Sequence, residues 1–312
     1  MPISETNFSL PGQTGFYKGK VRDVYYVDDI MVAVATDRIS AFDHILPRPI
    51  PHKGQVLNQI AGFFLDATRD IVPNWKLSMP HPNVTVGVLC NPIRIEMVIR
   101  GYLAGHALRQ YQAGHRELCG EKMPEGMQPN QAFEQPIITP ATKAESGHDI
   151  DISGEEIIAQ GILTKDIYDE MVNITRQLFQ RGTELAANQG LILVDTKYEF
   201  GWYRDQLYII DEIHTPDSSR YWYAHCYDQH VREGKPQEQL SKEFVREWLI
   251  AKGFQGLEGQ VMPVMDDDFV STVSKRYIYL YEKLTGNKFE PLSEELQKAE
   301  VMQSTIAAAL PK

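Results

Sequence analysis

Cysteine is scarce in this sequence: it has three, Cys90, Cys119 and Cys226, far apart and without CxxC spacing. An odd number of distant cysteines argues against both a disulfide framework and a cysteine-built metal site. The sequence also lacks any run of about 18 apolar residues, which a membrane-spanning helix needs. Its N-terminus has neither the basic start nor the apolar core of a signal peptide. These absences favour a cytoplasmic protein with no membrane contact.

Positive charge is also in short supply. There are 31 Lys and Arg residues against 42 Asp and Glu, which gives a formal net charge of −11, and no run of five basic residues occurs. Such a surface repels nucleic acid phosphates on average, so we expect no nucleic acid partner. Basic residues that do cluster are therefore interpreted as local sites for small anions.

Three common catalytic motifs are absent as well. The sequence contains no GxSxG, no HExxH and no GxxxxGK[ST], so it offers no support for a serine hydrolase, a zinc protease or a P-loop enzyme. What remains is an ordinary globular composition, with 43% hydrophobic and 23% charged residues in 312. That length suits one large domain or two of average size.

Residues 191–220 form the most informative segment. Two apolar strands, Leu191–Val194 and Leu207–Ile210, are joined by a turn around Arg204 and Asp205. Both strands run directly into acidic residues, and strands this apolar are typical of a buried sheet.

The acidic residues of this hairpin predict a metal site. Alternation along an extended chain places Asp195, Lys197 and Glu199 on one face. A three-residue turn would set Glu199 almost opposite Asp211, with Cβ atoms roughly 5 Å apart. Like charges at that distance need neutralising, and Mg²⁺ is the usual cation when phosphates complete its ligands. The alternative is a polar, solvated hairpin end.

Basic residues form a first candidate anion site near the N-terminus. In the segment Tyr17–Asp23, an extended chain would place Lys18, Lys20 and Arg22 on one face, and Gly19 would permit close backbone approach. This arrangement would suit a flap over a polyphosphate, although a solvated edge strand is the alternative.

Two further segments combine glycine or hydroxyl groups with arginine. Arg100 to His106 predicts a strand-to-helix junction with a basic group at each end, a geometry that binds phosphate well. Ser219 and Arg220 end a tight Thr-Pro-Asp-Ser-Ser-Arg turn directly after the acidic hairpin. A plain turn with a surface arginine is the alternative for the first segment.

The remaining pattern predicts an alternation of strands and helices. We expect a hairpin of Phe16–Val27 and Ile30–Ala35, a strand at Pro92–Arg100, a long functional loop at Glu117–Ala144, and helices at Gln55–Thr68, after Ser153, after Thr164, at Ser241–Lys252 and at Asp268–Leu284. The acids Asp266 to Asp268 are interpreted as helix-terminal and structural. The tail after Pro291 is expected to be marginally ordered.

Carboxylates for a metal, scattered lysines, a glycine flap and separate anion sites suit ATP–Mg²⁺ chemistry on a small anionic substrate. From these residues alone, a ligase and a small-metabolite kinase are equally supported. A non-catalytic nucleotide sensor is a further alternative.

In combination, six segments resemble the SAICAR synthetase family of purine biosynthesis. They are YKGKVRDVY, ATDRISAFD, PHKGQVLNQI, IEMVIRGYLAG, GLILVDTKYEFG and DEIHTPDSSRYW, which occur in the family's order over nearly the whole chain. The resemblance implies an α+β fold of two lobes with ATP-grasp-like architecture. A β-rich lobe of residues 1–95 would carry the phosphate flap, and an α/β lobe of residues 96–312 would carry the metal, nucleotide and substrate sites.

The resemblance also implies a reaction and its small-molecule partners. ATP would phosphorylate the carboxylate of the aminoimidazole ribonucleotide CAIR, and L-aspartate's amine would displace phosphate. Gly19, Lys20, Arg22, Lys143, Lys197 and Glu199 would contact ATP, with Lys20, Lys197 and Asp211 in catalysis, and the backbone near Cys90 to Pro92 along the adenine. Glu199, Asp211 and Asp149 would bind Mg²⁺, while Arg100, His106, Ser219, Arg220, Asp37, Ser40 and Lys53 would face CAIR or aspartate. The chain would be a monomer or homodimer.

His106 is a departure from the family, which usually has Ser or Thr at this position. Histidine can still donate a hydrogen bond to a phosphate, but it is larger and titrates near neutrality. This difference concerns the contact with the substrate phosphate rather than the type of reaction.

Overall fold

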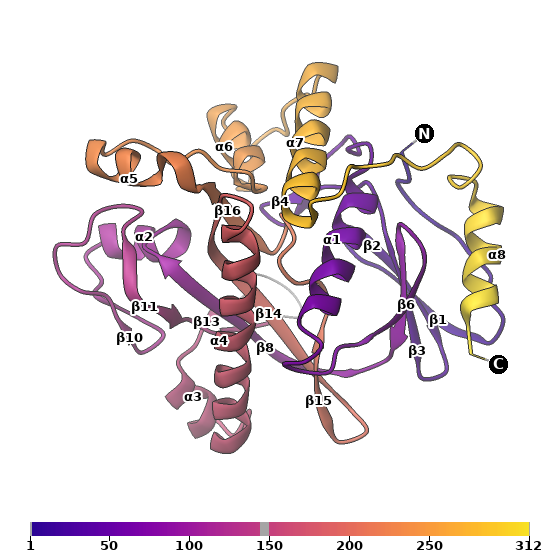
Figure 1. Cartoon of the computed structure of the whole chain (residues 1–312), viewed down its shortest axis with the longest axis horizontal. Coiled ribbons are helices and arrows are strands. Elements are labelled where there is room, and N and C mark those ends of the chain that lie inside the picture. Colours follow the sequence, from indigo (N-terminus) through magenta and orange to yellow (C-terminus); the bar gives the residue numbers. More distant parts are fainter. Residues whose placement is uncertain (1, 144–149, 312) are drawn as a thin grey trace.

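The computed structural model describes residues 2–143 and 150–311. Figure 1 shows two sheets side by side with helices around them, and the strands within each sheet pair antiparallel. Segregated helices and antiparallel sheets are typical of the α+β class, which confirms the predicted fold class.

The first sheet is built from the N-terminal part of the chain. Its strand order is β1 (Gln13–Lys18), β2 (Arg22–Val27), β3 (Ile30–Ala35), β7 (Val84–Val88) and β6 (Lys76–His81). Helix α1 (Lys53–Ala67) covers one face and α8 (Ala299–Ala309) the other. The short hairpin of β4 (Ser40–Ala41) and β5 (His44–Ile45) follows β3.

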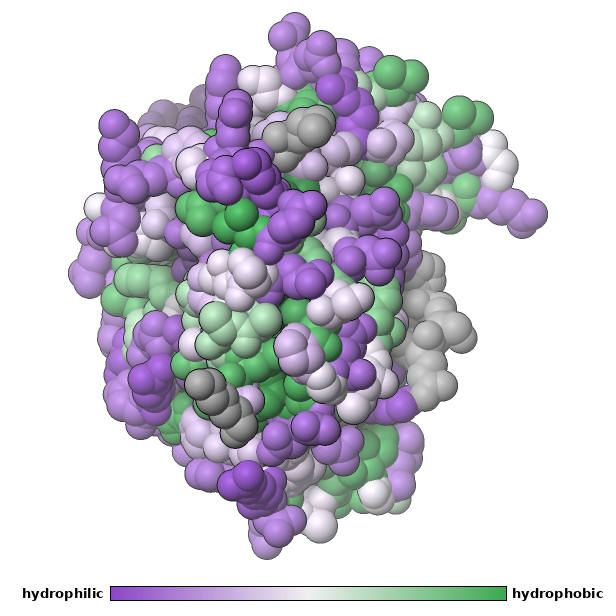
Figure 2. Space-filling model, turned by 90° about the vertical axis from the view of Figure 1, so that its right-hand side faces the viewer, coloured by the Kyte–Doolittle hydropathy of each residue, from purple (hydrophilic) through white to green (hydrophobic). Residues whose placement is uncertain are grey.

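Alternation along β3 explains why both faces are covered. Val32 and Val34 point to one side and pack in a cluster with Met302 and Ile306 of α8. Ala33 points to the opposite side, in the main core with α1. A sheet that is apolar on both faces needs two covering layers. Figure 2, which faces the α8 side, shows hydrophobic residues gathered in the middle and hydrophilic residues around them.

The second sheet has two long strands at its centre, β8 (Asn91–Tyr102) and β14 (Leu191–Tyr203). β12 (Ala141–Thr142) and β11 (Ala132–Ile138) pair with β8, β13 (Ile150–Asp151) pairs with β12, and β15 (Gln206–Ile210) and β16 (Ser219–Tyr223) pair with β14. Helix α4 (Lys165–Ala187) packs on β14 and β8. The other helices are α2 (Gly105–Gln112), α3 (Gly154–Ala159), α5 (Ala224–Glu233), α6 (Glu243–Ala251) and α7 (Asp267–Thr285).

The two sheets are joined through a shared core. The main hydrophobic cluster includes residues of α1, β8, β14 and α7. Backbone hydrogen bonds also link the segment before β6 to β15: the Trp75 N–H donates to the Ile209 carbonyl at 3.1 Å, and the Ile209 N–H donates to the Pro73 carbonyl at 2.9 Å. A division at residues 95 and 96 remains a proposal. β8 begins at Asn91, and α8 packs on the first sheet.

The helix ends follow the local signals. Ser153 and Glu156 form the predicted capping box of α3, and the Thr164 hydroxyl caps α4. Asp266 caps α7, and its C-terminal Gly286 has a left-handed φ of 70°. The interpretation of Asp266 to Asp268 as helix-terminal acids is confirmed.

Three predictions about the bounds of strands, loops and ordered segments were wrong. The predicted strand Phe16–Val27 is two strands, because the chain turns at Gly19–Val21 and the Gly19 N–H donates to the Arg22 carbonyl at 2.8 Å. The predicted loop at Glu117–Ala144 contains β9 (Glu117–Leu118), β10 (Glu121–Lys122), β11 and β12. The predicted marginal tail forms α8, which is ordered because Met302 and Ile306 are buried against the first sheet.

Candidate functional site

A cleft of about 990 Å³ is lined by residues from both large sheets and their connections. The first sheet's side contributes the β1–β2 turn and the segment from Ser40 to Asp43, and the second sheet's side contributes β8, β14, α2, α6 and residues 211–220. This volume suits a nucleotide-sized ligand. Acidic and basic side chains are interspersed along its walls, which is the composition expected for phosphorylated ligands and a cation.

The acidic hairpin is β14 and β15, joined by a two-residue turn. Arg204 and Asp205 have φ of 50° and 60°, as a tight primed hairpin turn requires. Tyr203 therefore pairs with Gln206, and Glu199 lies opposite Ile210. The predicted three-residue turn was wrong, and Asp211 lies one residue beyond the position opposite Glu199.

Glu199 and Asp211 nevertheless both line the cleft. Burial, reinforced by the charge of Asp211, raises the pKa of Glu199 to about 7. Two carboxylates in such an environment are hard oxygen donors whose repulsion a divalent cation would relieve. The donor set therefore fits Mg²⁺. The third predicted ligand, Asp149, lies outside the described residues.

Both carboxylates are already paired with basic side chains. Lys143 forms an ion pair with Glu199. Arg22 donates to Asp211 at 2.6 Å and to Glu212 at 2.6 Å. The predicted ATP contacts Arg22 and Lys143 thus lie directly beside the predicted metal ligands.

Lys197 and Glu96 form a pair that the sequence reasoning identified only in part. The Lys197 ammonium donates to Glu96 at 2.5 Å and lies 3.9 Å from Glu199. The sequence reasoning missed Glu96. Alternation along the predicted strand could have identified it, since Glu96, Val98 and Arg100 share one face and all line the cleft.

The β1–β2 turn places the flap residues at the cleft. Gly19 and Lys20 line it, and Lys20 pairs with Asp43 from the β4–β5 turn. Lys18 instead pairs with Glu5 at 2.9 Å, outside the cleft. The prediction that Lys18, Lys20 and Arg22 share one extended face was wrong, because the chain reverses direction between them.

Arg100 and Arg220 meet at the opposite end of the cleft. Asp195 accepts from Arg220 at 2.9 Å and lies 3.7 Å from Arg100, so one carboxylate holds two guanidinium groups. Glu243 lies 3.4 Å from Arg220. The remaining guanidinium donors suit anionic oxygens of a ligand.

Gly105 makes room for this arginine pair. It has a φ of 53°, and a Cβ at its position would lie 2.5 Å from the Arg220 guanidinium. Glycine is therefore favoured at the start of α2, both for its backbone conformation and because a Cβ would displace the Arg220 guanidinium.

His106 and Arg109 lie on α2 beside these arginines, and both line the cleft. The His106 Nε2 is 2.6 Å from Asp151. Arg109 is exposed, and no ion pair or side-chain hydrogen bond of it is found in residues 2–143 and 150–311. Sequence reasoning missed Arg109, although its position three residues after His106 places both on one helix face.

Other predicted substrate residues lie at varied distances from the cleft. Ser40 lines it. Ser219 hydrogen-bonds with Thr196 at 2.7 Å, beside Arg220 in the chain. Lys53 is fully buried and donates to Asp217 at 3.0 Å. It therefore holds Asp217, which lines the cleft, without lining the cleft itself. Despite burial, Lys242 and Lys53 hold the pKa of Asp217 well below its usual range.

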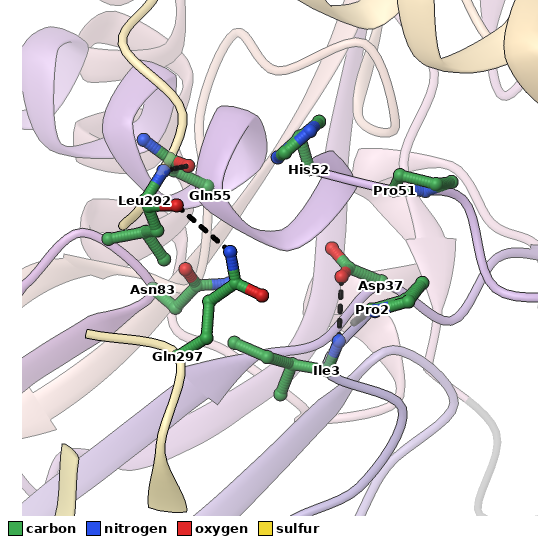
Figure 3. Close-up of a pocket in the computed structure, with 9 residues that line it drawn as sticks. All are labelled: Pro2, Ile3, Asp37, Pro51, His52, Gln55, Asn83, Leu292 and Gln297. Carbon is green, nitrogen blue, oxygen red and sulfur yellow. Dashed lines mark hydrogen bonds between the residues drawn. The ribbon is translucent and has the colours of Figure 1, made fainter. Parts of the chain in front are cut away.

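The structure does not bring Asp37 to the cleft. Its carboxylate accepts from the Ile3 N–H at 2.8 Å and the Gly54 N–H at 2.9 Å. Asp37 lines a separate pocket of about 190 Å³ between the N-terminal segment and α1, together with His52, Gln55 and Asn83 (Figure 3). Its hydrogen bonds fix the start of α1, which indicates a structural role.

No helix in the described part of the chain has both the length and the apolar character needed to cross a membrane. Residues 15–261 match the model of the SAICAR synthetase family.

Relatives named phosphoribosylaminoimidazole-succinocarboxamide synthase match over almost the whole chain. One from Cytophaga hutchinsonii is 59% identical, covering 98% of this chain and 99% of the relative. One from Bacteroides fragilis is 56% identical, covering 99% of each. Among solved structures, the SAICAR synthase of Saccharomyces cerevisiae complexed with SAICAR has a TM-score of 0.78 at 31% identity, covering 92% of this chain and 99% of the yeast chain.

Proposed function

The chain belongs to the SAICAR synthetase family, and we propose that its cleft joins CAIR and L-aspartate. The activity is an ATP-dependent ligation of purine biosynthesis. In the proposed route, the CAIR carboxylate attacks the γ-phosphorus of ATP and ADP leaves. The aspartate amine then attacks the acyl phosphate, phosphate leaves, and the amine's proton is lost to give SAICAR.

The observation that carries this proposal is that one cleft has two ends of different composition, one with carboxylates and lysines and the other with two arginines. At one end Glu199 and Asp211 lie beside lysines, and at the other Asp195 holds Arg100 and Arg220 together. The first end suits a polyphosphate with its cation, and the second suits a phosphorylated substrate. A transfer between two anionic ligands needs both ends.

We place ATP at the first end. Gly19 and Lys20 would cover its phosphates from the β1–β2 turn, and Lys143 and Lys197 would neutralise them from the second lobe. Mg²⁺ held by Glu199 and Asp211 would reduce the negative charge on the phosphates and orient them. Lys143 and Arg22, which now pair with these carboxylates, would then be released to contact the phosphates.

We place CAIR at the second end, against Arg100 and Arg220, with His106 near its phosphate. Aspartate carries two carboxylates and needs further cations. Lys242 and Arg246 of the α6 region line the cleft beside Ser218, and Ser40 faces it from the first lobe. These residues are our proposed contacts for aspartate.

A coupled assay of ADP release tests the reaction. We expect ADP only when CAIR, ATP, Mg²⁺ and L-aspartate are all present, each being omitted in turn. ADP release that needs no aspartate and yields a stable phosphorylated product would instead support a small-metabolite kinase. ATP binding without turnover would support a nucleotide sensor.

Arg109 provides a test of the CAIR orientation. We expect Arg109→Ala to weaken CAIR binding about threefold to tenfold. A charge-assisted hydrogen bond from a solvent-exposed guanidinium contributes less to affinity than one from a buried guanidinium. The CAIR ribonucleoside, which lacks the phosphate, should bind both proteins equally. Calorimetry on both ligands measures the difference.

Arg232→Ala is a matched control, since Arg232 is an exposed arginine on α5 outside the cleft. It should bind CAIR normally. Equal losses for nucleotide and nucleoside in Arg109→Ala would contradict the placement of the phosphate beside α2.

A further inference from the structure

Three potential metal ligands of different chemistry meet at the start of α5. A ring nitrogen of His225, the Cys226 sulfur and a carboxylate oxygen of Glu238 all lie within 4.8 Å of one another. None of these residues lines the cleft. We propose that they form a second metal site, for a thiophilic divalent ion of the Zn²⁺ class.

The distances are close to those of a Zn²⁺ site. Zn²⁺ binds sulfur at about 2.3 Å and nitrogen or oxygen at about 2.0–2.2 Å, so tetrahedral ligand atoms lie roughly 3.5 Å apart. The three atoms, at most 4.8 Å apart, therefore need to approach one another by up to about 1.3 Å. His225 and Glu238 are exposed and can rotate, while Cys226 is 7% exposed and fixed. A water molecule would complete the tetrahedron.

The backbone holds Glu238 next to the helix start. The Tyr223 N–H donates to the Glu238 carbonyl at 3.2 Å, and the Leu240 N–H donates to the Tyr221 carbonyl at 3.1 Å. Trp222 and Gln239 form an antiparallel bridge. Residues 238–240 thus extend alongside β16, and the ligands come from two segments that are already hydrogen-bonded together.

The sulfur and nitrogen ligands of this site disfavour Mg²⁺, the ion that we place in the cleft. Mg²⁺ prefers oxygen ligands, whereas a thiolate with an imidazole favours Zn²⁺ and related ions. Lys235, the nearest cation in the chain between the ligands, pairs with Glu233 at 2.7 Å rather than with Glu238. Glu238 is therefore available as a ligand.

The site connects two elements that reach the cleft. β16 carries Arg220, and the segment after Glu238 leads to Lys242 and Arg246, which line the cleft. A metal bound here would tie the α5–α6 connection to β16. We therefore expect the ion to stabilise the folded protein, because it binds a geometry that the unfolded chain lacks.

Co²⁺ serves as a spectroscopic probe for the metal-stripped full chain. We expect one Co²⁺ per chain to give a sulfur-to-metal charge-transfer band, which requires thiolate ligation. Cys226→Ser should abolish this band. Cys119→Ser and Glu199→Gln should keep it, which separates the new site from another cysteine and from the cleft.

Calorimetric titration with Zn²⁺ gives the second measurement. Glu238→Gln removes an exposed carboxylate with little change in shape, and we expect it to weaken this binding at least about tenfold, the lower end of losses around metal sites. Zn²⁺ should also raise the Tm of the parent protein more than that of Glu238→Gln. A band that is absent or survives Cys226→Ser, or unchanged Zn²⁺ affinity in Glu238→Gln, would overturn the proposal.

Discussion

Glu199→Gln is expected to lower turnover by about a hundredfold to a thousandfold while the protein remains folded. Glu199 is 7% exposed, and its carboxylate lies beside Asp211 and two lysines. Glutamine keeps its shape but supplies no charge for a metal ion. Losing one preorganised electrostatic contact of this kind typically costs about 10²–10³ in rate. Steady-state ADP release at saturating substrates measures the effect.

The stability of the same variant separates a functional role from a structural one. The folded-state pKa of Glu199 is raised from 4.5 to about 7, so its contribution to stability is present below pH 4.5 and is lost as pH rises through 7. At pH 8 the parent protein carries an unfavourable buried charge that glutamine removes. We therefore expect the Tm of Glu199→Gln at pH 8 to equal or exceed that of the parent.

Asp268→Asn is the matched control, because Asp268 is an exposed acid in the first turn of α7. It should keep full activity. Near-normal turnover of Glu199→Gln, or a large fall in its Tm at pH 8, would contradict the assignment of Glu199 to the metal and nucleotide end.

Arg220→Ala is expected to weaken CAIR binding by at least about tenfold while ATP–Mg²⁺ binding persists. A charge-assisted hydrogen bond contributes roughly 1.5–3 kcal/mol, which corresponds to about 10- to 150-fold in affinity. Asp195 and Glu243 orient the guanidinium from one side, and Gly105 leaves space on another. Calorimetry with each ligand measures the two affinities independently.

Arg220→Lys should recover only part of this loss, because an ammonium cannot reproduce the planar fork that spans Asp195 and a ligand. Retained ATP binding shows that the alanine variant is folded. If Arg220→Ala bound CAIR normally and lost ATP, the two ends of the cleft would be assigned in reverse and the kinase alternative would gain support.

Local features of this chain were predictable because their causes are local. The capping box at Ser153, the cap at Thr164 and the glycine at Gly286 each act within four residues of the helix end. The strand-to-helix junction after Arg100 was predictable for the same reason. Alternation within β14 correctly placed Lys197 and Glu199 on one cleft-facing side.

Several failures arose where distant segments meet. A KGKVR segment reads as one extended strand, but the turn at Gly19 directs Lys20 to Asp43 and Arg22 to Asp211. The tail after Pro291 looked weakly ordered because its partner, the valine face of β3, lies far away in the sequence. Asp37 looked like a substrate residue until its hydrogen bonds to Ile3 and Gly54 showed a structural use.

Residue order was therefore sufficient for most helix boundaries, since periodicity and caps are properties of short segments. The family, and the fold class that it implies, came from the order of six motifs along the chain. Tertiary contacts were needed to determine which charged side chains form ion pairs with one another. Arg22 reaches Asp211 across 189 residues, and Lys143 reaches Glu199 across 56. Electrostatic pairing depends on distance in space. The approach of the two sheets sets that distance for Arg22 and Asp211, and the strand order of the second sheet sets it for Lys143 and Glu199. The pairing of residues 238–240 with β16 likewise brings Glu238 to Cys226.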